Sequence, residues 1–206
     1  MSSQDFVQTF KLPKLSISKM RIRVRGLPPG LLCNKYPPDI PSEELMRMAP
    51  PARAQLTLHP LEIEREGTRW GFPAAGFKGA IVGIATSLVK PKVVKGKVKG
   101  SVRLIEPDDL VPIIADPESW VVFSAKAKTD RGQMIDNHRA RFPEWEAVLN
   151  IEYDADVVAF PTILRLFTAA GSAQGVGSFR RGCGGAFGGF ILTEAAGMPA
   201  ESEEAA

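Results

Sequence analysis

Two helical segments, each set between runs of strand-like sequence, most limit what this chain can fold into. The first is expected over residues 73–89, where Phe77, Ile81 and Ile84 recur at helical spacing on one side. Its proline at position 73 suits a first helical position, because proline fixes φ near the helical value. The second is expected over 157–171, with Pro161 near its first turn and Gly171 at its end.

Strand-like alternation surrounds these helices. In "LSISKMRIRVRGL" the apolar residues Met20, Ile22 and Val24 alternate with arginines, which predicts a strand with one basic face. Further strands are expected within 56–65, 108–114, 119–129, 145–154 and 186–194. The order predicts an α+β fold with a ferredoxin-like or RRM-like βαββαβ core, a long insertion after the first strand and another before the third.

The expected domain covers residues 1–193. Within it, the proline-rich segment 26–55 is expected to be a surface excursion with a short helix near 42–48, and 119–142 a thumb-like basic hairpin arm. Residues 194–206 hold glutamates and no basic residue, so they are expected to form a disordered acidic tail. The body is therefore more basic than the net charge of +3 indicates.

Composition excludes several function classes. There is no apolar run of the roughly 20 residues that a membrane helix needs, and the N-terminus does not resemble a secretory signal. Two cysteines and two histidines make a zinc site with four protein ligands improbable, so no metal or cofactor is expected. We expect a protein of the reducing cytoplasm with no membrane partner.

Glycine is concentrated in "GSAQGVGSFRRGCGGAFGGF", residues 171–190, with Arg180 and Arg181 in its middle. A Walker-type phosphate loop needs Lys-Ser or Lys-Thr after its glycines, and a dinucleotide fingerprint lies between a strand and a helix. Neither context is present. The remaining interpretation is a glycine-rich turn whose backbone amides, with the two arginines, are suited to hold a sugar-phosphate chain.

A helix, then "GVGSFRRGCGGAFGGF", then a last strand resembles the C-terminal glycine-rich loop of the RAMP superfamily, the ferredoxin-like CRISPR-associated RNA-binding proteins. The segment "FPAAGFKGAIVGIA" resembles the first helix of crRNA-backbone subunits and of compact phage-encoded relatives, and "SAKAKTDRGQMIDNHRARF" their thumb-like hairpin. The resemblance implies contacts to nucleic-acid backbone at Gly177, Arg180, Arg181 and Gly182. It also implies self-association or assembly with other subunits.

Cations elsewhere extend the candidate interface. Lys90 to Arg103 alternates lysine with valine and is expected to form a strand or hairpin with one cationic face, suited to tracking phosphates. Trp70 and Phe72 are candidates for base stacking, with core packing as the alternative. The full set of further candidate cationic or histidine contacts is Lys78, Lys95, Lys97, Lys99, Arg131, His138, Arg139 and Arg141.

These features favour a non-catalytic protein that binds single-stranded RNA or DNA. Two alternatives stay open. One is a metal-independent endoribonuclease with His59 or His138 as the general base. The other is a structural or assembly protein with the same fold and no nucleic-acid ligand. Cys183 has no base beside it in the sequence that would make it a nucleophile.

Overall fold

The computed structural model of the chain describes residues 16–34, 39–87, 94–128 and 134–198. A seven-stranded sheet forms its centre. Its strands are β1 (Ile17–Gly26), β3 (His59–Arg65), β4 (Thr68–Pro73), β5 (Val102–Leu104), β6 (Leu110–Ile114), β9 (Glu146–Asp154) and β10 (Phe190–Met198). They lie in the order β10-β1-β9-β6-β4-β3, with β5 also paired to β9, and all these pairs are antiparallel.

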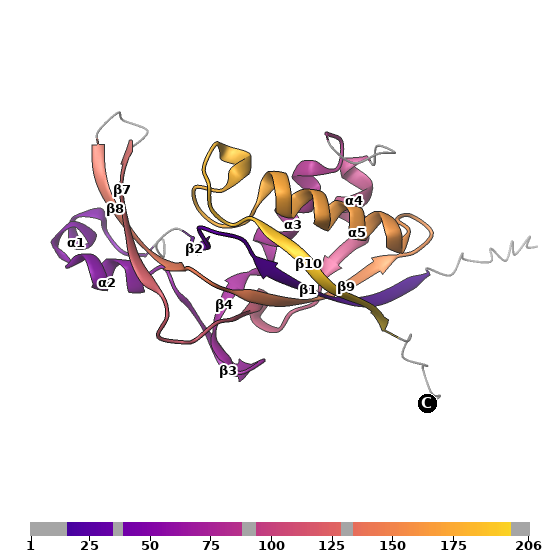
Figure 1. Ribbon diagram of the computed structural model, residues 1–206, viewed down its shortest axis with the longest axis horizontal. Coiled ribbons are helices and arrows are strands. Elements are labelled where there is room, and N and C mark those ends of the chain that lie inside the picture. Colours follow the sequence, from indigo (N-terminus) through magenta and orange to yellow (C-terminus); the bar gives the residue numbers. More distant parts are fainter. Residues whose placement is uncertain (1–15, 35–38, 88–93, 129–133, 199–206) are drawn as a thin grey trace, which may run out of the picture.

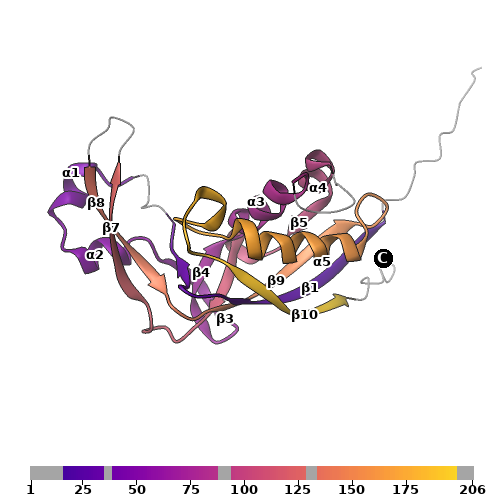
Figure 2. The same ribbon diagram turned by 45° about the horizontal axis from the view of Figure 1, so that its top comes forward.

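Two helices complete the predicted core. The chain passes through α3 (Ala74–Ile84) between β1 and β5, and through α5 (Phe160–Ala169) between β9 and β10. Both helices lie over the same face of the sheet (Figures 1 and 2). Strand order β10-β1-β9-β5 with helices at these two positions is the ferredoxin-like βαββαβ arrangement, so the predicted fold class is confirmed.

The alternation of apolar and basic residues along β1 decides which face of this strand packs against the helices. Met20, Ile22 and Val24 are fully buried beneath them, as the sequence predicted. The intervening arginines face away from this core. The two helices contribute to this core a set of side chains with no exposed surface: Phe77, Ile81, Ile163, Leu166 and Phe167.

A second, smaller unit projects from one end of the sheet (Figure 1). The predicted arm is a hairpin of β7 (Val121–Lys128) and β8 (Met134–Phe142), and β2 (Leu31–Leu32) adds a third strand to it. The insertion after β1 also forms α1 (Ser42–Arg47) and α2 (Pro50–Gln55). The insertion packs on the hairpin, because the Arg53 guanidinium donates to the Asp136 carbonyl at 2.7 Å and Thr57 Oγ1 accepts from the Ala140 amide at 3.0 Å.

Several predicted boundaries differ from the structure. Residues Lys95–Ser101 form helix α4, so the expected strand or hairpin there is wrong, and Lys90 and Lys92 lie outside the described residues.

Gly171 does not end α5, because the chain continues through a π-helical turn, Ala170–Gln174, and reverses at Gly175. Strand β10 continues to Met198, past the expected domain end at 193, and residues 199–206 of the predicted tail lie outside the described part. Short 3₁₀ turns occur at Pro107–Asp109 and Arg181–Cys183.

Within the described ranges, no helix has both the length and the apolar character needed to cross a bilayer.

Candidate nucleic-acid interface

The glycine-rich loop, residues 175–189, lies between the hairpin and the two core helices (Figures 1 and 2). Many of its amides are used within the protein. Val176 donates to the Gly188 carbonyl at 2.9 Å and Phe187 to the Phe179 carbonyl at 3.1 Å, which closes the loop on itself. Ser178 donates to the Leu32 carbonyl at 3.0 Å and thereby fixes the loop to β2. The loop is therefore a docked turn, and fewer of its amides face solvent than the sequence suggested.

The two candidate glycines of the loop have different surroundings. Gly177 is buried at φ +81°, and a Cβ there would overlap the Leu32 carbonyl oxygen, so glycine is required by the fold itself. Gly182 is exposed, and its Cβ would meet the flexible carboxamide end of the Gln174 side chain. Gly182 is thus the loop position that accepts a side chain more readily.

Arg180 and Arg181 also differ, although the sequence predicted the same phosphate contact for both. The Arg181 guanidinium donates to the Ser172 carbonyl at 3.0 Å and lies against Gly189, where a Cβ would be 2.6 Å from its central carbon. Arg180 makes a weak contact, 3.5 Å, to the Gly177 carbonyl. Arg181 therefore braces the loop, and Arg180 is the arginine better placed to meet a ligand.

Arg180 and Gly177 line a groove of about 190 Å³ between the loop and the N-terminal half of α3. Among its described lining residues none carries a carboxylate, and the α3 side is made of small residues. The first turn of α3 has no side-chain cap, so its amides and the positive end of the helix dipole add to the Arg180 charge. The groove is lined by Asn34, Phe72, Ala75, Gly76, Gly79, Ala80, Val176, Gly177 and Arg180.

Glycines 76 and 79 on α3 are not equivalent. A Cβ on Gly76 would lie 2.5 Å from the Phe72 ring, so internal packing explains this glycine. Around Gly79 there is nothing within 4 Å, and the residue is exposed. The fold gives no reason for glycine at position 79, although an interior helical glycine is unfavourable relative to alanine.

The candidate lysines lie on helices α3 and α4 and are absent from the lining of this groove. Lys78 is half-buried on α3, and both ribbon views place α3 between α4 and the glycine-rich loop (Figures 1 and 2). Lys95, Lys97 and Lys99 are exposed on α4. Helical spacing puts Lys95 and Lys99 on one side and Lys97 on another, so they do not form the single cationic face that was expected.

The hairpin residues divide into structural and accessible groups. Arg139 is 8% exposed, and its guanidinium donates to Ser178 Oγ at 2.6 Å and to Asn137 Oδ1 at 3.1 Å. We therefore remove it from the candidate phosphate contacts. Arg141 is half-buried, and His138 Nδ1 hydrogen-bonds to Ser124 Oγ at 2.7 Å. Arg131 lies outside the described residues.

Neither aromatic residue proposed for base stacking is well placed for it. Phe72 is 1% exposed and packs edge-on against Phe77, so it belongs to the core. Trp70 is half-buried, its Nε1 donates to the Pro117 carbonyl at 2.9 Å, and the Arg69 guanidinium lies 5.0 Å from the centre of its ring. The stacking prediction is wrong for Phe72, and internal contacts already occupy Trp70.

Sequence reasoning missed an aromatic cluster between the loop and the hairpin. Phe123 of β7 lies 4.9 Å from Phe187 and 6.3 Å from Phe179, measured between ring centres, in edge-on geometry. Phe179 is 39% exposed and directly precedes Arg180. The one sequence signal for this cluster was the aromatic residue next to an arginine in "SFRR". Whether the Phe179 ring is exposed, however, depends on how the loop folds.

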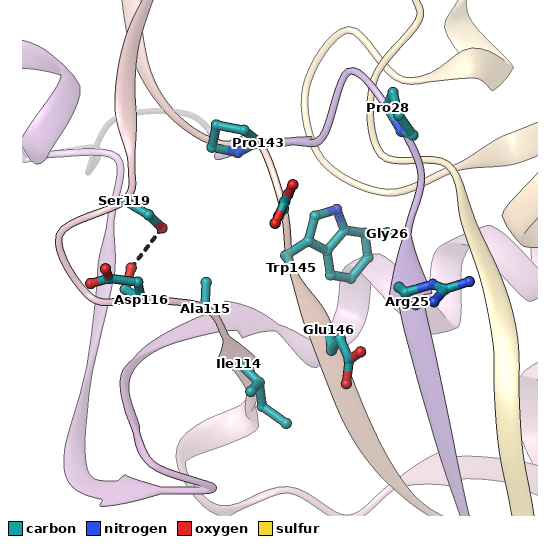
Figure 3. A pocket seen from close by; sticks show the side chains of 11 residues that line it. Arg25, Gly26, Pro28, Ile114, Ala115, Asp116, Ser119, Pro143, Trp145 and Glu146 are labelled. Atoms are coloured by element: carbon teal, nitrogen blue, oxygen red, sulfur yellow. Dashed lines mark hydrogen bonds between the residues drawn. The ribbon is translucent and has the colours of Figure 1, made fainter.

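A larger hollow, about 680 Å³, opens where β1, β6 and β9 end nearest the hairpin (Figure 3). Figure 3 shows Asp116 and Ser119 on one wall and Trp145 and Glu146 on the other. Its charged lining is Arg25 with the carboxylates of Asp116, Glu144 and Glu146, and Glu146 is paired to Arg23 at 3.2 Å. This excess of carboxylates disfavours phosphate in the larger hollow, whereas the described lining of the α3 groove carries no carboxylate.

The candidate general bases do not line the groove. Burial lowers the pKa of His59, and its Nε2 is buried without a hydrogen-bond partner among the described residues. Burial also raises the pKa of the Cys33 thiol to about 12, whereas Cys183 is exposed. Within the described ranges, no group of three His, Cys, Asp or Glu side chains is placed to hold a metal ion.

No protein-family model matches the chain, and no curated protein matches it. Among solved structures, the chain is similar to a chain in the cryo-EM structure of the type III-B Cmr-β complex bound to cognate target RNA. The two share 11% sequence identity with a TM-score of 0.41, over 89% of this chain and 61% of that one. This chain thus spans less than two thirds of that neighbour. Strand order and helix placement alone define the ferredoxin-like fold of this chain.

Proposed function

We propose that this protein binds single-stranded RNA or DNA through the sugar-phosphate backbone, in the groove between α3 and the glycine-rich loop. The observation that carries the proposal is Gly79. It is a mid-helix glycine with nothing within 4 Å of its Cβ position, and it lines the same groove as Arg180.

A glycine in a helix interior costs about 0.5–1 kcal/mol relative to alanine. Internal packing explains that cost at Gly76 but not at Gly79. A ligand whose backbone lies close against α3 would explain it, because even a methyl group at position 79 would stand in the groove.

Charge indicates the class of ligand. Arg180 and the uncapped first turn of α3 face the groove with positive charge, and the described lining offers no carboxylate. Helix N-termini and arginines both favour phosphate oxygens. Exposed Lys95, Lys97 and Lys99 on α4 extend the positive surface beyond α3, which suits a strand longer than one nucleotide.

Binding of labelled single-stranded RNA, single-stranded DNA and duplex, each over a salt series, tests the proposal. We expect weak sequence dependence and a log-log salt slope of about −0.7 for each phosphate neutralised on a single strand. If the protein binds none of the three at low salt, the proposal fails and a structural or assembly role takes its place.

Gly79→Ala gives a sharper test, because stability and binding should move in opposite directions. The variant should melt about 1–4 °C higher, since 1 kcal/mol corresponds to about 2–4 °C in a chain of this size. It should nevertheless bind single strands more weakly, and Gly79→Leu more weakly still. Thr168→Ala, at an exposed position of α5 away from the groove, is the matched control and should leave affinity unchanged. Unchanged affinity in Gly79→Leu would contradict the site assignment.

We further propose that binding does not lead to cleavage. The two histidines considered as general bases, His59 and His138, are absent from the groove lining. Bound RNA should therefore stay intact on long incubation without divalent metal. Cleavage that is lost in His59→Ala or His138→Ala would instead establish the endoribonuclease alternative.

Assembly along the strand is a separate proposal, supported by the resemblance of the sequence to crRNA-backbone subunits. Light scattering behind size exclusion should then show a particle that grows with oligonucleotide length. A single protomer on every length of strand would contradict it.

A further inference from the structure

Phe179 has a backbone conformation that aromatic residues rarely adopt. Its φ is +47°, in the left-handed region, where a Cβ-bearing residue is strained. The residue is also 39% exposed, so burial of the ring does not explain the strain. Strained backbone of this kind persists where the surrounding structure enforces it, and it is concentrated at functional sites.

The neighbours of Phe179 enforce its conformation from both sides in the sequence. Its carbonyl accepts from the Phe187 amide at 3.1 Å, and a Cβ on Gly185 would overlap that carbonyl oxygen. Before it, the Ser178 amide is bonded to Leu32 and the Ser178 hydroxyl accepts from Arg139. These contacts fix the backbone on both sides of Phe179 and thereby hold this residue at its positive φ.

The Phe179 ring rests on the hairpin without being covered by it. Its centre lies 6.3 Å from that of Phe123 at an interplanar angle of 63°, an edge-on contact that fixes the ring direction. Arg180 follows directly and lines the groove toward α3. An exposed aromatic ring therefore stands on the hairpin side of the arginine proposed to hold phosphate.

We infer that Phe179 is a base-stacking residue that makes this site selective for strands with unpaired bases. This inference rests on the proposed function. Aromatic faces accept any base, so such a residue adds affinity without sequence preference. Bases within a duplex are already stacked on each other and cannot reach the ring. The chemical class of ligand is therefore a single strand whose bases are free, held by phosphate at Arg180 and by one base at Phe179.

The experiment compares an oligoribonucleotide with an abasic oligomer of equal length, since the two differ in bases and share their phosphates. Phe179→Ala should weaken binding of the base-containing strand by about 10-fold and change binding of the abasic strand by less than about twofold. Phe179→Trp should keep wild-type affinity. Arg180→Ala should weaken both strands alike. Val122→Ala, which removes a similarly exposed apolar side chain from β7, is the matched control and should change neither.

If Phe179→Ala folds poorly, Phe179→Gly removes the ring and also relieves the positive-φ strain, so it keeps the loop testable. Equal losses on both strands, or no loss on either in a folded variant, would overturn the stacking role while leaving the groove in place. If the wild-type protein binds neither strand, the proposed function itself fails.

Discussion

Arg139→Met tests whether the hairpin arginine is a structural brace, as its contacts indicate, or a phosphate ligand, as its sequence context suggested. The Arg139 side chain is 8% exposed. Its guanidinium donates to Ser178 Oγ at 2.6 Å, which joins the hairpin to the glycine-rich loop, and to Asn137 Oδ1 of the same strand at 3.1 Å. A third contact, to the Cys33 carbonyl at 3.4 Å, is weak. Methionine has a similar unbranched length and removes the charge and all donors.

The expected loss follows from the two short bonds. Hydrogen bonds that involve a charged group contribute about 1.5–3 kcal/mol each, so two of them give about 3–6 kcal/mol. Removing a buried charge recovers part of its desolvation cost, which leaves a net loss of about 3 kcal/mol. For a chain of this length that corresponds to a fall of about 6–12 °C in melting temperature.

Urea unfolding and thermal melts measure the stability, and binding is measured at a temperature where both proteins are folded. Arg141→Met is the matched control, because Arg141 lies on the same strand, is half-buried and carries the same charge. Its stability should change by less than about 1 kcal/mol. If Arg139→Met loses less than the control while its affinity and salt slope fall, Arg139 is a phosphate ligand and the brace is refuted.

Arg180→Ala should reduce the salt slope by about 0.7 with little change in melting temperature. Arg181→Ala should instead lower the melting temperature, because it removes the bond that ties the loop to the Ser172 carbonyl of the π-helical turn; a salt series and melts on both variants test this. Because burial raises the pKa of Cys33 to about 12, a thiol reagent at neutral pH should modify Cys183 in the native protein and Cys33 only after unfolding. Burial raises the pKa of Glu106, so its contribution to stability is fully present at pH values below the ordinary pKa of a glutamate and is lost as the pH rises through the folded pKa. Urea midpoints should therefore decline less with rising pH in Glu106→Gln.

Strand and helix order could be predicted from the sequence because each core element has a clear apolar period. Met20, Ile22 and Val24 alternate along β1, and Phe77 and Ile81 recur at helical spacing on α3. All five are buried as expected. Once the order strand, helix, strands, helix, strand is known, few antiparallel arrangements remain, and the ferredoxin-like one is among them.

Helix α4 shows where local pattern is insufficient. Lysine alternates there with glycine and valine, which predicts a strand, and Gly96 and Gly100 are poor helix formers. Val98 is its one buried residue, and packing on α3 and β5 decides the conformation. An isolated helix this short is unstable, so tertiary contacts supply what local propensity does not.

The candidate site was predicted in part. Position and charge of Arg180 follow from the sequence, and so does the presence of a glycine-rich turn before the last strand. Phe179 was missed because its exposure depends on a positive φ that no local preference of phenylalanine indicates. The bracing contacts of Arg139 could not be foreseen, because a basic residue in a polar hairpin gives no sign of a carbonyl and a hydroxyl brought to it from distant segments.

Gly79 differs physically from the glycines that close the loop, and the difference decides where the interface can be tested. A Cβ at Gly177, Gly185 or Gly188 would overlap a backbone carbonyl oxygen, of Leu32, Phe179 and Val176 respectively. Substitution at these positions would disrupt the loop whatever the protein binds, so lost binding there would say nothing about contact. Gly79 has open space around it and lies on a helix that alanine would strengthen. Lost affinity there cannot be attributed to lost folding, which makes α3 the place where the proposed ligand should be detected.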